Sequence, residues 1–248
     1  MIRFITTFIL GLSLVARAET TTNLSSVTYS CVKVGERAIV IDGNLNDKAW
    51  AKAAVMENLQ TAGPKPVPAK YLSKARLLWS DKRLFLAFEC KIDAIRSTMT
   101  RRDDDIWNEE CAELYLCPRG SEAKYYEIDF NPQNAIYDSM LHSYKYQEQV
   151  KHYKEWALAY NAKVESKTKV LKDADGKVTG WILEAAIPFS DLAEANHVPP
   201  LTGDAWWFNV FRIAQIGEKE CEYSAWVPTL ADFHKPWMFP RLRFVDAK

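Results

Sequence analysis

The stretch DDDIWNEECAELYL, residues 103–116, joins an acidic turn to an alternating segment and points to a β scaffold. Leu114 and Leu116 fall on one face of an extended chain. Glu113 and Tyr115 fall on the other, because successive side chains alternate across a strand. Such alternation predicts a strand with one face in a core and the other toward water.

Trp107 lies in the acidic turn, just before the alternation begins. A large amphipathic ring held beside carboxylates is typical of a site that stacks on a sugar ring and hydrogen-bonds its hydroxyl groups. The alternative is that Trp107 closes the end of the core, since tryptophan is highly buried on average. Residue type alone leaves both interpretations open.

Outward from this stretch, the chain continues as short alternating segments separated by turn residues, with little helical periodicity. The pattern predicts three hairpins, whose strands cover residues 75–80 with 84–90, 111–117 with 125–130, and 156–171 with 178–187. Further strands are expected at 206–214, 223–227 and 241–245. Strands without crossover helices predict an all-β fold, a two-sheet antiparallel β-sandwich of jelly-roll or immunoglobulin-like type.

Helical structure is expected at two short segments only. Residues 46–54 form the first, capped by Asp47 and carrying Trp50, and residues 190–194 form the second. The segment 138–155 is polar and aromatic, so it is interpreted as a long loop or a poorly formed helix.

Composition and charge limit the class of partner. The 248 residues are 48% hydrophobic and 26% charged, as in an ordinary globular domain. Thirty-two Lys plus Arg balance thirty-two Asp plus Glu, so no whole-molecule field favours a nucleic-acid partner.

The N-terminus has the pattern of a leader. Arg3 precedes an apolar run over residues 4–15, and the sequence Ala-Arg-Ala at 16–18 fits the rule for signal cleavage. No later segment is long and apolar enough to span a membrane. We therefore expect a secreted, periplasmic or cell-surface protein, with a signal peptide at 1–18 cleaved after Ala18, a flexible lead and first strand at 19–37, and one domain at 38–248.

The five cysteines lie after this leader. An odd number in an oxidising compartment leaves at least one unpaired, and the sequence assigns no disulfide. Their spacing matches no zinc site.

Seven motifs follow one another along the chain: IDGNLNDKAW at 41–50, LWSD with LFL at 78–86, the Trp107 block, WILEAAIPF at 181–189, FNV at 208–210, SAWVPT at 224–229 and FPRLRF at 239–244. In this order they resemble the family-9 carbohydrate-binding modules, over roughly residues 38–245. The resemblance implies a β-sandwich that binds an oligosaccharide or polysaccharide and catalyses no reaction.

The resemblance also implies a sugar clamped between two aromatic rings. Trp107 matches the first ring. Spacing from the last motifs places the second at Phe233, with His234 and Trp237 close enough to share the role.

Carboxylates complete the site that the resemblance implies. Glu113 matches a glutamate that bonds sugar hydroxyls, whereas Glu127 stands where the family has an arginine, which predicts a different ligand preference. Together with Asp129 they are expected to line a concave polar surface, the alternative being an ordinary wet sheet face. Arg212 interrupts an apolar strand, so it is expected to pair with one of these carboxylates or to reach a ligand.

Family-9 modules also carry a structural calcium ion, usually near the loop before the central strand. Asp93, Asp103, Asp104 and Asp105 supply the oxygen ligands that such an ion needs. The alternative is a solvated acidic turn.

Catalysis is not expected. Paired carboxylates are also used in glycoside hydrolysis, but neither a Ser/His/Asp set nor a metalloprotease motif occurs among the four histidines. Two non-catalytic alternatives remain. One is a haem-binding electron-transfer domain, with Met140, His142 and His152 as the clustered axial candidates; the other is a structural envelope protein with a vestigial site.

Overall fold

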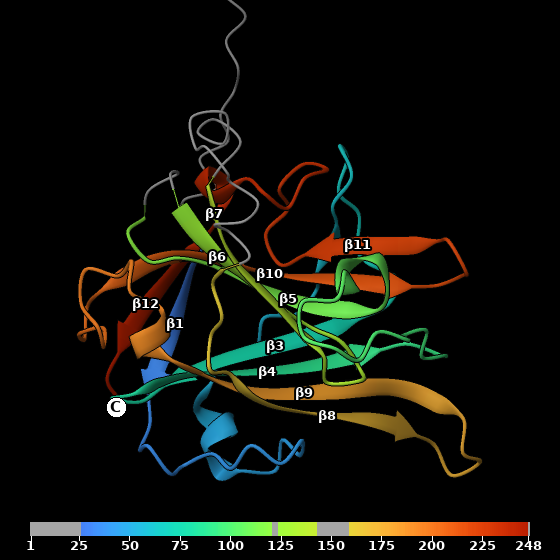
Figure 1. Ribbon diagram of the computed structural model, residues 1–248, viewed down its shortest axis with the longest axis horizontal. Helices are drawn as coiled ribbons and strands as arrows, with labels where there is room; N and C mark the ends of the chain where they lie inside the picture. The colour runs from blue at the N-terminus through green and yellow to red at the C-terminus, as the bar shows by residue number, and fades with distance from the viewer. Residues whose placement is uncertain (1–25, 121–123, 143–158, 248) are drawn as a thin grey trace, which may run out of the picture.

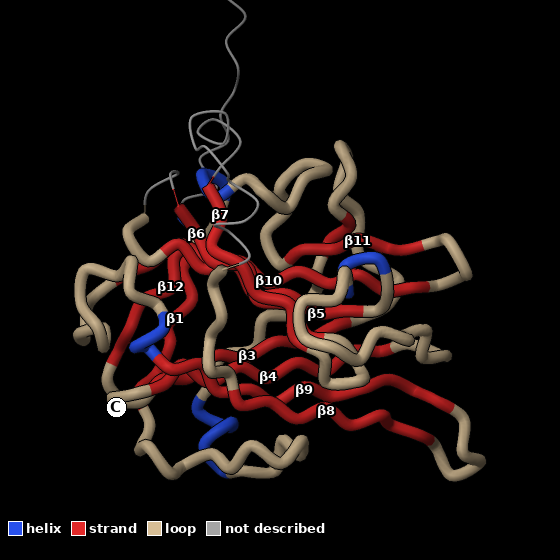
Figure 2. Tube along the Cα trace, viewed as in Figure 1, coloured by secondary structure: helices blue, strands red, loops and turns tan. Residues whose placement is uncertain are grey.

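The computed structural model describes residues 26–120, 124–142 and 159–247, and strands dominate these ranges (Figures 1 and 2). The strands are β1 (Thr28–Lys33), β2 (Gln60–Thr61), β3 (Ser73–Trp79), β4 (Arg83–Lys91), β5 (Cys111–Cys117), β6 (Lys124–Phe130), β7 (Ile136–His142), β8 (Glu165–Lys172), β9 (Val178–Pro188), β10 (Ala205–Gln215), β11 (Cys221–Ala225) and β12 (Arg241–Val245). Short 3-10 helices interrupt them: η2 (Lys48–Lys52), η3 (Ile106–Asn108), η4 (Phe189–Asp191) and η5 (Pro236–Met238).

The strands form a curled sheet in the order β7-β6-β5-β10-β12-β1-β3-β4-β9-β8, with β11 beside β10 and β2 beside β11. The sheet folds over at β12 and β1, so that β3, β4, β8 and β9 make one layer and β5, β6, β7 and β10 make the other (Figure 1). The predicted all-β sandwich is confirmed. The two layers, however, belong to one hydrogen-bonded ladder.

This continuity depends on β1, which pairs in parallel with both β12 and β3. The sequence analysis expects antiparallel neighbours, because hairpins are visible as two alternating segments around a turn. A parallel pair between the first and last strands has no connecting turn, so local sequence carries no signal for it.

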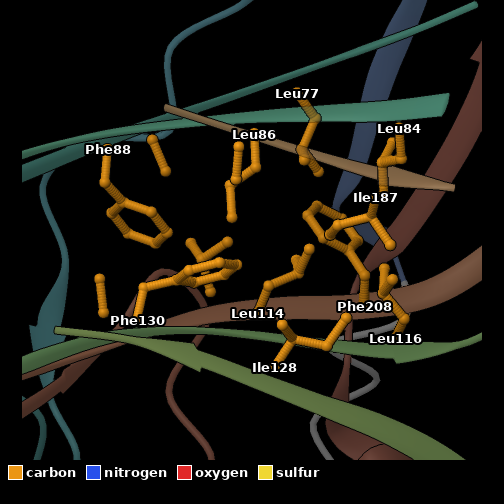
Figure 3. Packing of buried hydrophobic residues seen from close by; sticks show 14 of the residues in the cluster. Leu77, Leu84, Leu86, Phe88, Leu114, Leu116, Ile128, Phe130, Ile187 and Phe208 are labelled. Atoms are coloured by element: carbon orange, nitrogen blue, oxygen red, sulfur yellow. The ribbon is translucent and has the colours of Figure 1, made fainter. Parts of the chain in front are cut away.

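The core lies between the two layers, where apolar side chains from both sides interdigitate (Figure 3). One layer contributes Leu77, Leu84, Leu86, Phe88 and Ile187, and the other contributes Leu114, Leu116, Ile128, Phe130 and Phe208. Trp79 and Trp181 are buried in the same core, and Trp50 is buried in a smaller cluster beneath η2.

The three predicted hairpins are present as β3–β4, β5–β6 and β8–β9. In the last of them, Gly176 adopts a φ of 80°, and the Asp173 carboxylate accepts hydrogen bonds from the backbone N–H groups of Asp175 and Lys177. A residue without Cβ suits this left-handed position. The hairpin begins at Glu165, later than residue 156.

Both expected helical segments are single 3-10 turns, η2 and η4. Asp47 stands at the N-cap position of η2 but makes no side-chain cap. Its carboxylate accepts a hydrogen bond from Val40 N at 2.9 Å and so ties the preceding loop.

The interpretation of 138–155 as loop or helix needs correction, because β7 occupies Ile136–His142. Its pairing with β6 supplies the hydrogen bonds that decide the structure. Residues 143–158, including His152, lie outside the described residues, as does the expected signal peptide.

All five cysteines lie within the described residues and none of them forms a disulfide there; Cys221 alone is not buried. Within the described residues, no helix has the length and apolar character needed to cross a membrane.

Candidate functional site

A cavity of about 870 Å³ lies on the outer face of the layer formed by β5, β6, β7 and β10. Strand alternation aims Leu114 and Leu116 into the core, so Glu113 and Tyr115 point the other way, into this cavity. The rest of the lining comes from distant segments: the turn at η3, the loop after β2, the start of β11 and the loop before η5. Pairing of β2 with β11 brings residue Thr61 to the rim.

Trp107 lies in η3 and lines the cavity. The turn that carries it is fixed by its neighbours, because the Glu109 carboxylate accepts hydrogen bonds from Thr98 N and Met99 N. The indole packs edge-on against Tyr137, with ring centroids 4.5 Å apart. The indole of Trp107 therefore packs against Tyr137 and also borders the cavity.

Phe233 lines the same cavity from the loop before η5. Its ring stacks on Phe211 with centroids 4.2 Å apart and an interplanar angle of 23°, and it meets Tyr223 edge-on. The structure therefore gathers the two predicted clamp positions, Trp107 and Phe233, around one hollow.

His234 and two tyrosines form the wall beside Phe233. The Tyr125 hydroxyl hydrogen-bonds His234 Nδ1 at 2.9 Å, and the Tyr115 ring stacks on Tyr125. The Tyr115 hydroxyl donates to Glu127 Oε1 at 2.8 Å. Three stacked or hydrogen-bonded rings thus lead along this wall to the carboxyl group of Glu127.

Three carboxylates lie at the base of the cavity. Glu113 on β5 stands directly opposite Asp129 on β6, and Glu127 lies two residues before Asp129 on the same face. Glu113 is 1% exposed, Glu127 6% and Asp129 0%, and one oxygen from each lies within 4.8 Å of the others. Glu113 and Glu127 line the cavity, and Asp129 lies behind them.

Their environment opposes ionisation. Burial, followed by the negative charge of Glu127, raises the pKa of Glu113 from its ordinary value of 4.5 to about 8. Burial also raises the pKa of Glu127, against the opposing influence of His234 and the Tyr115 hydrogen bond. The pKa of Asp129 is raised well above its ordinary value by burial and by both glutamates.

Arg212 is placed differently from the expectation, which is corrected here. It lies on the core face of β10, fully buried, and pairs with Glu110 instead of with Glu113, Glu127 or Asp129. Glu110 also accepts hydrogen bonds from Trp181 Nε1 at 2.7 Å and from Gln215 N at 2.9 Å. The alternation of β10 turns Arg212 away from the cavity, because its neighbours Phe211 and Ile213 face outward.

Trp237 also lies apart from the other predicted site residues. It belongs to η5, is 44% exposed and does not line the cavity.

The aspartates expected to hold calcium do not come together. Asp93, Asp103 and Asp105 are exposed, and Asp104 is tied to Arg101. Among the described residues, the one set of three or more acidic, His or Cys side chains with ligand atoms within 4.8 Å of one another is Glu113, Glu127 and Asp129. Their carboxylates are therefore not gathered around one point, and calcium binding at this loop stays a prediction.

Sequence reasoning misses several lining residues. Tyr125 has a detectable signal, since it stands two positions before Glu127 and so shares its face. Tyr137 is missed because β7 is not predicted, and Thr61 because β2 is only two residues long.

Comparison with known proteins places this geometry in a family. The model of the family described as carbohydrate family 9 binding domain-like matches residues 41–205. No curated protein matches the chain.

Solved structures of similar fold support that match. A family-9 carbohydrate-binding module from Caldicellulosiruptor kristjanssonii in complex with cellotriose is 14% identical, with a TM-score of 0.61, covering 89% of this chain and 95% of its own. The same description with glucose gives 14% identity, a TM-score of 0.60 and coverage of 89% and 97%. A putative carbohydrate-binding protein from Bacteroides uniformis is 15% identical, with a TM-score of 0.66 and coverage of 88% and 99%. Because the family model spans more than half of the chain, this protein belongs to the carbohydrate family 9 binding domain-like family, a family of non-catalytic carbohydrate-binding modules.

Proposed function

We propose that this protein is an exported glycan-binding domain that holds a sugar in the cavity between Trp107 and Phe233, above the carboxylates of Glu113 and Glu127. The observation that carries the proposal is that the two aromatic positions and both glutamates line one hollow of about 870 Å³. This volume is in the range of small-molecule sites.

The chemistry of the lining suits a sugar. The C–H groups on one side of a pyranose ring are apolar and pack on an aromatic ring, while its hydroxyls donate hydrogen bonds to carboxylates. Phe233 is braced by Phe211 and Trp107 by Tyr137, so little side-chain entropy is lost when a ligand orders them.

Two solved neighbours of this fold hold cellotriose and glucose, which makes these sugars the natural probes. The leader at 1–18 supports export, and a binding domain outside the cytoplasm suits capture or breakdown of a polysaccharide. The partner we propose is accordingly an oligosaccharide or a polysaccharide.

The haem alternative gains no support from the described residues. Met140 packs partly buried against the core, away from the cavity. His142 is on the same strand, and His152 lies outside the described residues.

Isothermal titration of residues 19–248 with glucose, cellotriose and oligosaccharides of xylan and mannan tests the proposal. We expect saturable binding to at least one sugar and a loss of about tenfold or more in affinity for Trp107→Ala, because an aromatic anchor is removed. Trp237→Ala is the matched control, since this tryptophan is exposed outside the cavity. Equal affinity for all three proteins would refute the proposed site.

A further inference from the structure

The acidic base of the cavity has a property that sugar binding does not explain. Glu113, Glu127 and Asp129 are buried side by side, although like charges at this distance repel strongly in a poorly solvated environment. We propose that these three residues form a binding site for a divalent cation of the calcium class. The site is distinct from the acidic loop of Asp93, Asp103 and Asp105.

The spacing fits such an ion. Oxygens bound to calcium at about 2.3–2.6 Å lie no more than about 5 Å apart, even when they are on opposite sides of the ion. One oxygen from each of the three side chains meets this condition, since all lie within 4.8 Å of one another. Carboxylate oxygens are also the ligand type that calcium prefers.

The second observation is a set of unused acceptors. Among the described residues, no donor group hydrogen-bonds to either oxygen of Asp129 or to Oε2 of Glu113, and Asp129 meets only the neighbouring carboxyl group of Glu127. Buried polar groups are normally satisfied, and a buried carboxylate without a donor is costly. Asp129 is wholly buried beside Glu113 and Glu127, and one of its oxygens lies within 4.8 Å of an oxygen from each of them.

In the part of the chain that the structure describes, no cation forms an ion pair with Glu113 or Asp129. The positive charge of the buried Arg212 acts on Glu113 through space, but this side chain lies on the core face of β10 and pairs with Glu110. A bound ion would supply the missing positive charge. Glu113 and Glu127 border the cavity, so the ion has a path of entry and keeps coordination positions for water or for a ligand hydroxyl, a coupling that rests on the proposed function.

Two other occupants of the cluster are outcomes of the test. A proton shared between Glu127 and Asp129 would satisfy part of the cluster without an ion. The ammonium group of an amino sugar would fit the same acceptors, although Asp129 does not line the cavity that such a ligand must enter.

The experiment is a titration of residues 19–248 with calcium chloride after treatment with chelator, followed by calorimetry and thermal unfolding, with no sugar present. The variants Asp129→Asn and Glu113→Gln keep the shape of the side chain but remove the carboxylate group that a cation would bind. Asp103→Asn is the matched control, because Asp103 is exposed and its φ of 61° suits asparagine.

We expect one calcium ion per chain and a rise in Tm for the natural protein and for Asp103→Asn. Asp129→Asn should lose at least tenfold in calcium affinity and most of the rise in Tm. Its Tm in chelator should stay close to that of the natural protein in chelator, because asparagine has the shape of the protonated aspartic acid that this buried site favours without an ion, and this shows that the variant folds.

The proposal is overturned if calcium does not bind saturably, or if Asp129→Asn binds it as tightly as the natural protein. A separate titration with glucosamine that shows binding, where calcium shows none, would also overturn it, in favour of an ammonium site. Because the calcium titrations contain no sugar, failure of sugar binding leaves their result unaffected.

Discussion

At the scale of single residues, Glu113 should make the stability of the protein depend on pH. Its pKa is raised to about 8 in the fold, from 4.5. Between these values the unfolded chain releases a proton that the folded chain retains, so the free energy of unfolding falls as pH rises, by about 1.4 kcal/mol per pH unit for each such carboxyl.

Urea unfolding in chelator between pH 4.5 and 8 measures this dependence. Glu113→Gln, which cannot ionise, should show a shallower fall in stability with rising pH. A slope unchanged by the substitution would contradict the assignment of the raised pKa to Glu113.

Arg212 gives a second prediction at this scale. Replacing it by methionine leaves Glu110 buried without its cation, and breaking such a pair typically costs about 3–5 kcal/mol. Sugar affinity of the folded fraction should be unchanged, because Arg212 does not line the cavity. Urea unfolding and sugar titration of Arg212→Met check both parts; retained stability with lost affinity would show that Arg212 contacts the ligand.

The residue scale also shows how far the sequence predicts the site. Trp107, Glu113, Glu127 and Phe233 all line the cavity, as their positions in the motifs lead one to expect. The prediction assigns Arg212 the wrong ion-pair partner, because a charged residue in an apolar strand does not indicate which carboxylate will pair with it. The partner is Glu110, which lies immediately before β5 and forms an ion pair with Arg212.

At the scale of secondary-structure elements, Gly180 allows β9 to lie close to β4. A Cβ built on Gly180 would stand 2.2 Å from the carbonyl oxygen of Cys90, well inside contact distance. Gly180→Ala must therefore push the paired strands apart, and we expect a loss of about 1–3 kcal/mol in the free energy of unfolding.

Denaturant unfolding measures the effect, and Gly35→Ala is the control because its added Cβ would meet no atom within 4 Å. Equal stability of the two variants would contradict the close approach of β4 and β9 at this position.

The sequence predicts strands well where the two paired strands follow one another closely along the chain. The β3–β4 and β5–β6 hairpins follow from alternation around short turns. The strand β7 is not predicted, because the alternation of YDSML at 137–141 places Asp138 on the core side, where an ion pair with Arg102 and a hydrogen bond from Ala162 N make its burial tolerable. Tertiary contacts decide such a segment, and local sequence does not contain them.

At the scale of the whole molecule, the cavity exists only when the complete layer is assembled. Its lining joins the loop after β2, the turn at η3, four neighbouring strands, β11 and the loop before η5. No short stretch of sequence contains this combination. The family resemblance therefore supplies what local patterns lack, and the structure adds that Glu113, Glu127 and Asp129 are buried close together at the base of the cavity.

The most direct test of the central claim is a titration of the nitrogen-15-labelled protein with cellotriose and glucose, read from the indole N–H signals of its nine tryptophans. We predict a saturable shift of the Trp107 signal, assigned through Trp107→Phe, while the signals of Trp181 in the core and Trp237 outside the cavity stay in place. Saturable shifts that spare Trp107 and move Trp237, or no shift with either sugar, would contradict the account.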